Sequence, residues 1–167
     1  DLEMANWFEK ILPSFIKKET TKKSSVPEGL WKTCSACNTI LYVPELEASL
    51  YVCPKCDHHV RIGARKRLDL FLDTDNQIEI AADKSPTDWL KFKDTKRYKD
   101  RLIEAEENSE EQEALVVMQG SVLKLPLVAA AFEFRFMGGS MGAVVGQKFV
   151  EGVDHALKNQ FPFVCFS

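Results

Sequence analysis

Residues 34–56, CSACNTILYVPELEASLYVCPKC, decide the fold of the first part of this chain. Cys34 and Cys37 form one C-x2-C pair and Cys53 and Cys56 form a second, with fifteen residues between the pairs. This spacing is typical of zinc sites. Two residues between cysteines allow a tight turn that directs both sulfurs at one ion, and the returning chain completes a tetrahedron with Zn–S distances of about 2.3 Å. We therefore predict one zinc ion bound by these four cysteines.

Four thiolates complete the coordination sphere of zinc, so the predicted metal is structural and has no open position for water or substrate. Zinc contributes roughly 10–16 kcal/mol of apparent binding free energy in finger peptides. A unit of about thirty residues has too small a core to fold without such help. We predict a small all-β zinc ribbon at residues 30–60, with strands at 39–43 and 50–52. The alternatives are a redox role for a cysteine pair or replacement of a ligand by His58 or His59.

The residues before the ribbon, 1–29, are predicted to form a short N-terminal helix and a polar, lysine-rich linker. Apolar side chains recur at helical spacing over 7–16, but Glu9, Lys10 and Pro13 interrupt them. The segment therefore lacks the unbroken apolar stretch of a secretory signal, and no apolar run approaches the ~18 residues of a membrane span. A membrane-surface or partner-docking helix is the alternative. We expect a reducing, cytoplasmic location, where cysteines serve as ligands or core residues and disulfides are rare.

Overall charge gives no sign of nucleic-acid binding, because 22 lysines and arginines face 25 aspartates and glutamates for a net charge of −3. A local basic patch does follow the second cysteine pair. Its functional interpretation is attraction of phosphate, on nucleic acid or on the 3′-phosphoadenosine end of coenzyme A. Its structural interpretation is a solvated helix face whose side-chain stems pack on apolar surface. Both stay open. The basic patch consists of Lys55, Arg61, Arg65, Lys66 and Arg67.

A helical connecting region is predicted at residues 61–113. Its first helix, 64–72, has apolar side chains on one face, and a short strand at 77–80 and a charged helix at 96–107 follow. Residues 104–113 contain six glutamates and no basic residue. We predict that this acidic segment is a solvated helix end and loop.

Residues 114–167 are predicted to fold as an α/β unit, because strands, a helix and a further strand follow in order. The strands are expected at 115–118, 122–123, 127–136 and 161–166, and the helix is expected to end near Asn159. A buried strand needs cover on both faces. We therefore expect the 167 residues to be part of a longer protein, or of a domain that another chain completes.

Three details of this unit are predicted from its pattern. Residues 124–126 are expected to form the turn between the first long strands. The side chains of Phe132, Phe134 and Phe136 are expected on one face of a strand, because their spacing is two residues. Cys165, in an apolar run, is expected to be a core residue.

A glycine-rich turn, residues 138–142, lies between a predicted strand and a predicted helix. Glycine permits positive φ angles and close approach of the backbone to a ligand. Ser140 is expected to cap the following helix, whose free N–H groups favour an anion. Gly146 and Gly152 inside that helix each cost about 1 kcal/mol against alanine, so we expect that the core, a partner chain or the substrate packs tightly on the helix. The candidate substrate-binding residues are Gly138, Gly139, Ser140, Met141 and Gly142, and no catalytic side chain is assigned.

The chain resembles the beta subunit of the bacterial and plastid acetyl-coenzyme A carboxylase carboxyltransferase, from Trp7 to Ser167. The resemblance rests on four stretches that occur in the family in the same order. Asn38 stands where a glycine is common, and asparagine tolerates the left-handed conformation. The stretches are PEGLWKTCSACNTILYVPELEASLYVCPKCDHHVRIGARKRLDLFLD (27–73), EALVVMQG (113–120), AAAFEFRFMGGSMGAVVGQKF (129–149) and FPFVCFS (161–167).

This resemblance implies a zinc ribbon followed by a crotonase-like ββα spiral domain, of which residues 114–167 would be the first part. The family transfers a carboxyl group from carboxybiotin, on biotin carboxyl carrier protein, to acetyl-coenzyme A, and the malonyl-coenzyme A formed is used in fatty-acid biosynthesis. The implied partners are the carboxyltransferase alpha subunit, in an α2β2 assembly, and an ATP-dependent biotin carboxylase. Backbone N–H groups at helix N-termini would stabilise the thioester enolate.

In the family, a second glycine pair that supplies oxyanion donors follows the strand that corresponds to 161–167. The resemblance therefore implies that these 167 residues alone are inactive. Two other roles for the ribbon remain open. One is a nucleic-acid-binding module that uses Arg61, Arg65, Lys66 and Arg67. The other is a lid over the active site or a brace at the subunit interface.

Overall fold

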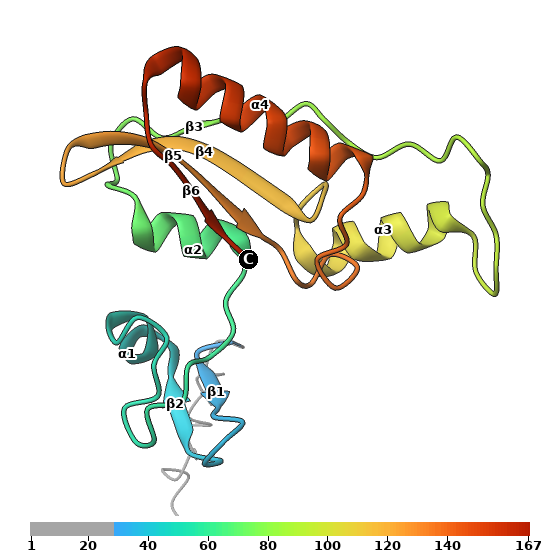
Figure 1. Ribbon diagram of the computed structural model, residues 1–167. Coiled ribbons are helices and arrows are strands. Elements are labelled where there is room, and N and C mark those ends of the chain that lie inside the picture. Colours follow the sequence, from blue (N-terminus) through green and yellow to red (C-terminus); the bar gives the residue numbers. More distant parts are fainter. Residues whose placement is uncertain (1–28) are drawn as a thin grey trace, which may run out of the picture.

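The computed structural model describes residues 29–167, which form a small cysteine-bearing ribbon and a larger α/β unit (Figure 1). The helix and nearly all of the linker predicted in residues 1–29 lie outside the described residues. The ribbon lies on the side of helix α2 (Ala64–Phe71) that faces away from the four-stranded sheet. Residues 61–63 connect the ribbon to α2. Between residues 29 and 167, no helix has both the length and the hydropathy needed to cross a bilayer.

The ribbon contains a two-stranded antiparallel sheet and a short helix. Strand β1 (Trp31–Thr33) pairs with β2 (Ile40–Tyr42), which confirms the strand expected near 39–43. Helix α1 (Val43–Ala48) follows at once, with proline in its first turn, where the missing N–H costs no hydrogen bond. The ribbon is therefore not purely β. Its small core consists of Cys34, Leu41, Leu46, Tyr51 and Cys53.

The strand predicted at 50–52 is wrong. Leu50 and Tyr51 have φ angles of 54° and 63°, in the left-handed region that a strand cannot use. This segment forms a turn in which only Val52 pairs, through an isolated bridge to His59. The turn places the Tyr51 ring in the ribbon core, a position that alternation of apolar residues alone does not reveal.

The α/β unit is built on a four-stranded sheet in the order β3-β4-β5-β6. Neighbouring strands are antiparallel except for β5 and β6, which are parallel and joined by helix α4. The elements are β3 (Ile78–Glu79), β4 (Leu115–Val122), β5 (Leu125–Phe132), α4 (Ala143–Asn159) and β6 (Phe163–Phe166). The predicted strand–strand–helix–strand order is confirmed.

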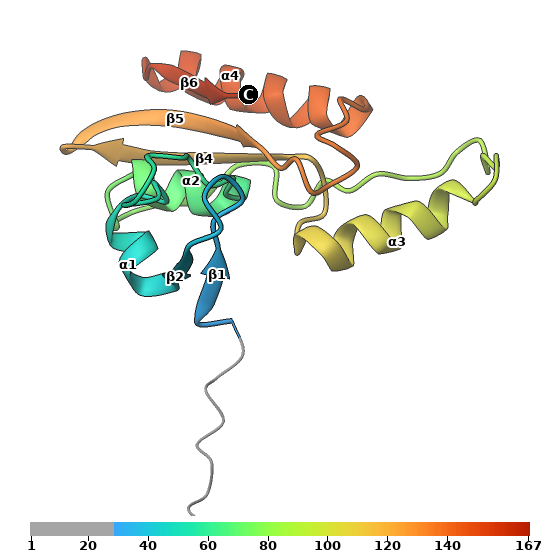
Figure 2. The ribbon, with the colours of Figure 1, turned by 90° about the horizontal axis from the view of Figure 1, so that it is seen from below.

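Helices cover both faces of this sheet, α4 one face and α2 the other (Figure 2). Strand β4 serves both cores, because alternate residues point to opposite faces. Val117 packs in the core beneath α4, while Val116 and Met118 pack in the core against α2. Burial on both faces explains why β4 and β5 are nearly continuous apolar runs.

Helix α4 approaches the sheet most closely at Gly152. A Cβ atom there would lie 2.7 Å from Cγ1 of Val117 and 3.2 Å from the ring of Phe163. The tight packing expected at this glycine is confirmed. At Gly146 an added Cβ would meet no described atom within 4 Å, so packing against the core is excluded there and packing against a partner chain or substrate stays a prediction.

The hairpin between β4 and β5 turns at Leu123 and Lys124, one residue earlier than predicted. Both residues have positive φ, 50° and 67°, as a two-residue hairpin turn of type I′ requires. Pro126 lies inside β5, opposite Ser121. The turn lacks the asparagine and glycine that usually mark this type. Instead, the carboxylate of Asp73 accepts hydrogen bonds from the Ser121 hydroxyl (2.8 Å) and from the backbone N–H groups of Leu123 (3.2 Å) and Lys124 (2.8 Å).

Asp73→Asn is expected to loosen this turn. The backbone N–H of Lys124, the Ser121 hydroxyl and the N–H of Leu123 hold the pKa of Asp73 below its ordinary value of 3.8. Its stabilising effect is therefore fully present above that value and is lost as the pH falls through the lowered pKa. Amide chemical shifts of the turn, followed by NMR from neutral to acidic pH, should report this loss. Asp75→Asn, which removes a nearby carboxylate without these bonds, is the control. A turn that is unchanged in Asp73→Asn would refute the assignment.

The acidic segment is only partly solvated, contrary to the prediction. Helix α3 (Tyr98–Ser109) is confirmed, and its C-cap, Glu110, adopts the left-handed conformation. Beyond it, Glu111 and Glu113 are buried. Glu111 pairs with an arginine, and Glu113 accepts a hydrogen bond from the N–H of Ala114.

The segment after β5 also departs from prediction, because the strand ends at Phe132. The chain then turns, so Phe134 is 54% exposed while Phe136 is buried, and the three phenylalanines share no strand face. Cys165 is exposed on β6, which has a sheet neighbour on one side only among the described strands. The expected core position of Cys165 is therefore wrong for the part of the chain that the structure describes.

Candidate functional site

The four predicted metal ligands meet at one point of the ribbon. Their Sγ atoms all lie within 4.8 Å of one another. Cys34 and Cys56 are 3.7 Å apart and Cys37 and Cys53 are 3.8 Å apart, measured between sulfurs. A tetrahedron with Zn–S distances of about 2.3 Å has sulfur–sulfur edges of about 3.8 Å. The cysteines are thus positioned to bind one zinc ion.

Two matching turns present these sulfurs. In the first, the N–H of Asn38 donates to the carbonyl of Cys34 (2.9 Å), and in the second the N–H of Asp57 donates to that of Cys53 (2.9 Å). Asn38 and Asp57 both have left-handed φ angles, 55° and 56°. Asparagine and aspartate tolerate this conformation better than other non-glycine residues, so Asn38 replaces a glycine at little cost, as expected.

Hydrogen bonds around the first turn favour thiolates. The backbone N–H groups of Cys37 and Ala36 lower the pKa of Cys34. The hydroxyl and the backbone N–H of Thr39 lower the pKa of Cys37 to about 6. Because zinc binds the deprotonated sulfur, both effects aid metal binding. In the second turn the N–H of His58 lowers the pKa of Cys56, but burial and the three neighbouring sulfurs outweigh it and raise that pKa to about 12. His58 contacts the Ser35 hydroxyl at 3.0 Å and lies outside the sulfur cluster, so four cysteines suffice.

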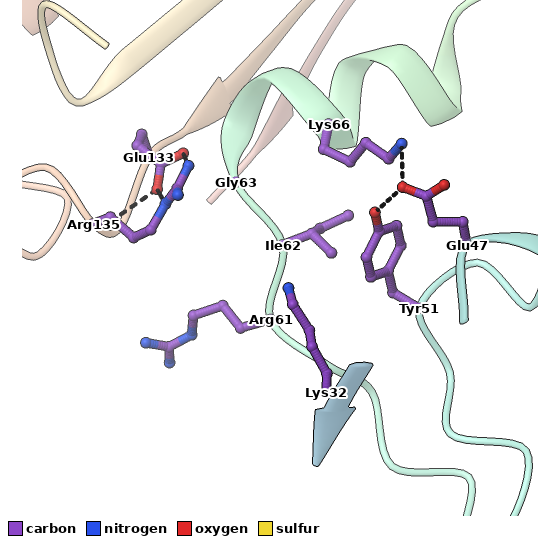
Figure 3. Close-up of a pocket in the computed structure, with 9 residues that line it drawn as sticks. All are labelled: Lys32, Glu47, Tyr51, Arg61, Ile62, Gly63, Lys66, Glu133 and Arg135. Atoms are coloured by element: carbon purple, nitrogen blue, oxygen red, sulfur yellow. Dashed lines mark hydrogen bonds and ion pairs between the residues drawn. The ribbon is translucent and has the colours of Figure 1, made fainter. Parts of the chain in front are cut away.

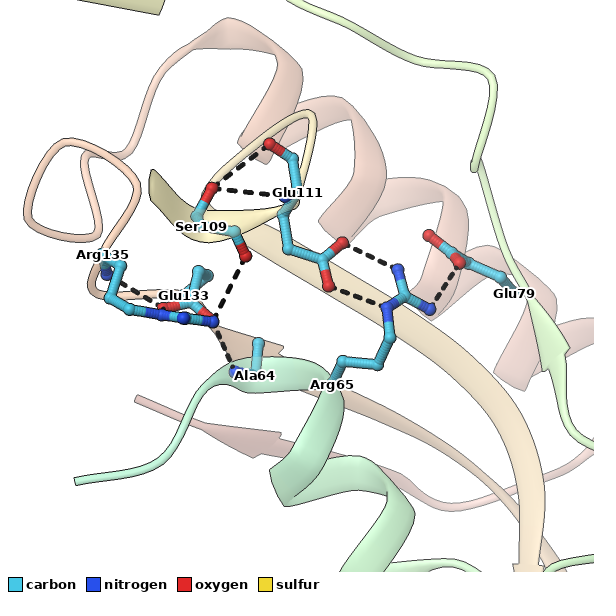
Figure 4. Close-up of polar contacts among 7 residues, drawn as sticks. All are labelled: Ala64, Arg65, Glu79, Ser109, Glu111, Glu133 and Arg135. Carbon is cyan, nitrogen blue, oxygen red and sulfur yellow. Dashed lines mark hydrogen bonds and ion pairs between the residues drawn. The ribbon is translucent and has the colours of Figure 1, made fainter. Parts of the chain in front are cut away.

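Two side chains of the basic patch, Arg65 and Lys66, are paired with carboxylates. Arg65 makes a double hydrogen bond to the buried Glu111, both at 2.7 Å, and a third to Glu79 at 2.9 Å (Figure 4). These carboxylates, Glu111 first, raise the pKa of Arg65. Lys66 pairs with Glu47 at 3.0 Å.

The other three members of the patch have no ion pair within residues 29–167. The guanidinium of Arg61 lies 4.1 Å from the centre of the Phe134 ring, and that of Arg67 lies 5.9 Å from the centre of the Phe166 ring. Lys55 is exposed on the second cysteine turn. Arg65 and Lys66 are paired with carboxylates, which neither interpretation expected, and phosphate binding by the patch stays a prediction.

A pocket of about 410 Å³ lies where the ribbon meets the α/β unit (Figure 3). Its residues come from β1, α1 and the turn after α1, the 61–63 connector, α2 and the turn after β5. Only the tertiary fold brings these segments together, so sequence reasoning found just two of the lining residues, Arg61 and Lys66. The lining consists of Lys32, Glu47, Tyr51, Arg61, Ile62, Gly63, Lys66, Glu133 and Arg135.

Glu133 links the N-terminus of α2 to the turn after β5, at the junction between the ribbon and the α/β unit. It is 1% exposed, and it accepts hydrogen bonds from the first N–H of α2, that of Ala64 (2.9 Å), and from the N–H of Arg135 (2.9 Å). The Arg135 guanidinium bridges Glu133 (3.1 Å) and the carbonyl of Ser109 (3.2 Å). Burial alone would raise the pKa of Glu133, but the bonds from Arg135 and Ala64 lower it below its ordinary value.

Gly63 allows the carboxylate of Glu133 to reach the N-terminus of α2. A Cβ atom there would lie 2.5 Å from Oε2 of Glu133 and 2.8 Å from a guanidinium nitrogen of Arg135. Any other residue would push the carboxylate away from the N-terminus of α2. The signal in the sequence was the FEFR stretch, in which charged Glu133 and Arg135 alternate with phenylalanines.

The five candidate substrate-binding residues form one surface turn between β5 and α4. Gly138 and Gly139 have φ angles of 70° and 75°, which explains the glycines. Gly142, not Ser140, is the N-cap of α4, and no side chain caps that end, so the capping predicted for Ser140 is wrong. Met141 is 81% exposed. Contact between this turn and a substrate stays a prediction.

Comparison with known proteins matches the ribbon to a family model and relates the chain to several solved structures. Residues 31–56 match the family model described as the acetyl-CoA carboxylase zinc finger domain. A single-chain, multi-domain long-chain acyl-CoA carboxylase is 20% identical with a TM-score of 0.52, over 64% of this chain and 11% of that chain.

Two further solved structures are similar. The transcarboxylase 12S structure, with methylmalonyl-coenzyme A and methylmalonic acid bound, is 25% identical with a TM-score of 0.49, over 75% of this chain and 20% of that chain. The beta subunit of P. aeruginosa geranyl-CoA carboxylase is 17% identical with a TM-score of 0.44, over 63% of this chain and 18% of that chain. This chain thus spans a fifth or less of each of these proteins.

The predicted fold class is confirmed, except that the ribbon, expected to be all-β, also contains helix α1. The described residues form a four-cysteine zinc ribbon followed by part of a crotonase-like α/β fold. The ribbon is of the type found in acetyl-CoA carboxylases.

Proposed function

We propose that this chain belongs to the beta subunit of a biotin-dependent carboxyltransferase and that its acyl substrate is acetyl-coenzyme A. One observation carries the proposal. A ribbon that matches the acetyl-CoA carboxylase zinc finger over 31–56 precedes a partial fold that is similar to an acyl-CoA carboxylase. The combination supports carboxyl transfer more strongly than either part alone, because zinc ribbons and crotonase-like folds each occur with many functions.

In the proposed reaction the carboxyl group moves from a biotin nitrogen to the α-carbon of the acetyl thioester, and a proton of that carbon goes to the nitrogen. Carboxybiotin on a separate carrier protein supplies the group. The turn from Gly138 to Gly142 would bind the thioester beside the uncapped N-terminus of α4. Backbone N–H groups there favour the negative oxygen of an enolate. The zinc ion, held by four sulfurs, has a structural role.

The proposal includes partners that would complete the site. They are a carboxyltransferase alpha subunit on the biotin side, a biotin carboxyl carrier protein and an ATP-dependent biotin carboxylase, and the product malonyl-coenzyme A would serve fatty-acid synthesis in the cytoplasm. The incomplete fold supports an active site built with more chain than the described residues, because these span a fifth or less of similar carboxylases.

The test is the reverse reaction, measured with the whole zinc-loaded beta protein and its alpha subunit. We expect biocytin-dependent conversion of malonyl-coenzyme A to acetyl-coenzyme A, faster than the reaction of methylmalonyl-coenzyme A. Gly139→Ala should lower the rate about tenfold, because a Cβ at a φ of 75° strains the turn that would bind the thioester.

Gly146→Ala is the matched control, because it adds the same atom three residues into α4, where no atom of residues 29–167 other than the helix's own backbone and its neighbours lies within 4 Å. Its rate should equal that of the parent protein. Absence of biocytin-dependent turnover would refute carboxyl transfer. A preference for methylmalonyl-coenzyme A would refute the acetyl substrate, and a normal rate in Gly139→Ala would refute the role of the turn.

A further inference from the structure

We propose that the pocket between the ribbon and the α/β unit binds a phosphoryl anion, the phosphomonoester or diphosphate group of a small ligand. The pocket is lined by four cationic side chains and two carboxylates. The cations are Lys32, Arg61, Lys66 and Arg135. This excess of positive charge lines a concave space of about 410 Å³ that is open to solvent, and Lys32 and Arg61 are themselves exposed.

Both carboxylates in the lining are already occupied. Glu47 accepts hydrogen bonds from the Tyr51 hydroxyl (2.8 Å) and pairs with Lys66 (3.0 Å). These partners, Tyr51 first and then Lys66, lower the pKa of Glu47, which keeps it ionised. Glu133 is bound by Arg135 and by the N-terminus of α2. Neither carboxylate is therefore free to neutralise the remaining cations.

The remaining cations are Lys32 and Arg61. Within residues 29–167 neither makes an ion pair or a side-chain hydrogen bond. Figure 3 shows the Lys32 ammonium beside the 61–63 connector, with Tyr51 and Lys66 to one side and Arg135 to the other. Arg61 is held by the Phe134 ring at 4.1 Å, so its guanidinium is partly ordered before any ligand binds. Both side chains line the pocket, although Figure 3 shows the Arg61 guanidinium directed away from the Lys32 ammonium. Two unpaired cations that line one pocket favour an anionic ligand.

Phosphate suits these side chains better than a carboxylate does. A phosphoryl group carries up to two negative charges, which match the two unpaired cations. A guanidinium offers a planar fork for two phosphate oxygens, and a lysine adds a mobile point charge. Because Lys32 comes from the ribbon and Arg61 from the connector, one ligand would contact both parts of the junction.

A small ligand is favoured over a polynucleotide. A nucleic-acid strand needs a continuous basic surface, but Arg65 is saturated by Glu111 and Glu79. Arg67 and Lys55 are outside the pocket lining. The phosphoryl group could belong to a free diphosphate or to the phosphoadenosine end of a coenzyme A thioester. The pocket chemistry is the same for both.

Calorimetric titration of the zinc-loaded chain with inorganic pyrophosphate tests the proposal. We expect one binding site, and we expect Lys32→Gln and Arg61→Gln each to weaken binding about tenfold, since each removes a charge-assisted hydrogen bond. The double variant should show no measurable binding. Arg67→Gln is the matched control, because it removes an exposed arginine of the same region outside the pocket, and its affinity should stay unchanged. Zinc content and circular dichroism should show that all variants are folded.

Two further titrations identify the source of the phosphate. A phosphoadenosine ligand is supported if adenosine 3′,5′-bisphosphate competes with pyrophosphate and if its binding is lost in the same variants. Pyrophosphate binding without such competition supports a free diphosphate. The proposed phosphoryl site would be refuted if pyrophosphate does not bind at low salt. It would also be refuted if Arg67→Gln weakens pyrophosphate binding as much as Lys32→Gln and Arg61→Gln do. Binding of a DNA oligonucleotide without binding of pyrophosphate would refute it as well. None of these outcomes depends on carboxyl transfer, so the pocket and the proposed function can fail separately.

Discussion

Replacing Cys53 by serine is expected to release the zinc ion and unfold the ribbon. Cys53 is fully buried at the centre of the ribbon core, and the four sulfurs are the only metal-binding cluster of three or more ligands between residues 29 and 167. Mutation of residues that only hydrogen-bond to the metal ligands already lowers metal affinity about 10–100-fold. Removal of a ligand itself should therefore lower the zinc affinity of this site further. Zinc supplies roughly 10–16 kcal/mol of apparent free energy in finger peptides, which a core of five residues cannot replace.

Zinc content and two-dimensional NMR of the purified variant check this expectation. Resonances of the ribbon should collapse to unfolded positions, while those of β4 and β5 should persist, because their cores contain no ribbon residue. Cys165→Ser is the matched control, since Cys165 is exposed and outside the sulfur cluster. A variant at Cys53 that keeps one zinc ion and a folded ribbon would contradict the structural role of the metal.

Glu133→Ala is expected to lower the free energy of unfolding of the α/β unit by about 3 kcal/mol. The substitution leaves the N–H of Ala64 without its acceptor and removes the partner of Arg135. Glu133 is 1% exposed, so water cannot readily replace the lost bonds. The effect should exceed that of a surface ion pair, which is worth about 1 kcal/mol or less.

Urea unfolding monitored by circular dichroism measures this loss. Glu133→Gln retains one acceptor oxygen and should show an intermediate loss. The control is Glu107→Ala, an exposed glutamate of α3 without an ion pair in the described residues, and it should stay within about 0.5 kcal/mol of the parent. Equal stability of Glu133→Ala and Glu107→Ala would show that the junction does not depend on this carboxylate.

Features that depend on neighbouring residues were predictable from the sequence. The two C-x2-C pairs located the metal ligands, and the apolar periodicities of 64–72 and of the segment after the glycine turn located α2 and α4. In each case the interaction that stabilises the element joins residues close in the sequence. The register of a helix or a metal-binding turn can therefore be deduced locally.

Features that depend on distant partners were not predictable. Glu111 is buried because Arg65, 46 residues away, pairs with it, so a count of acidic residues wrongly indicated a solvated loop. The position of the hairpin turn depends on Asp73, about fifty residues before it. The junction pocket draws on Lys32 and Arg135, which are about a hundred residues apart, and no local pattern links them.

The alternation of side chains along β4 links the two helical layers. Val117 faces α4 while Val116 and Met118 face α2. A shift of β4 by one residue would move Val117 to the face of α2 and Val116 and Met118 to the face of α4. Both cores would then lose their β4 side chains at the same time. Because one strand contributes to both layers, loss of its pairing should disrupt both, and we expect the α/β unit to unfold as a single cooperative block.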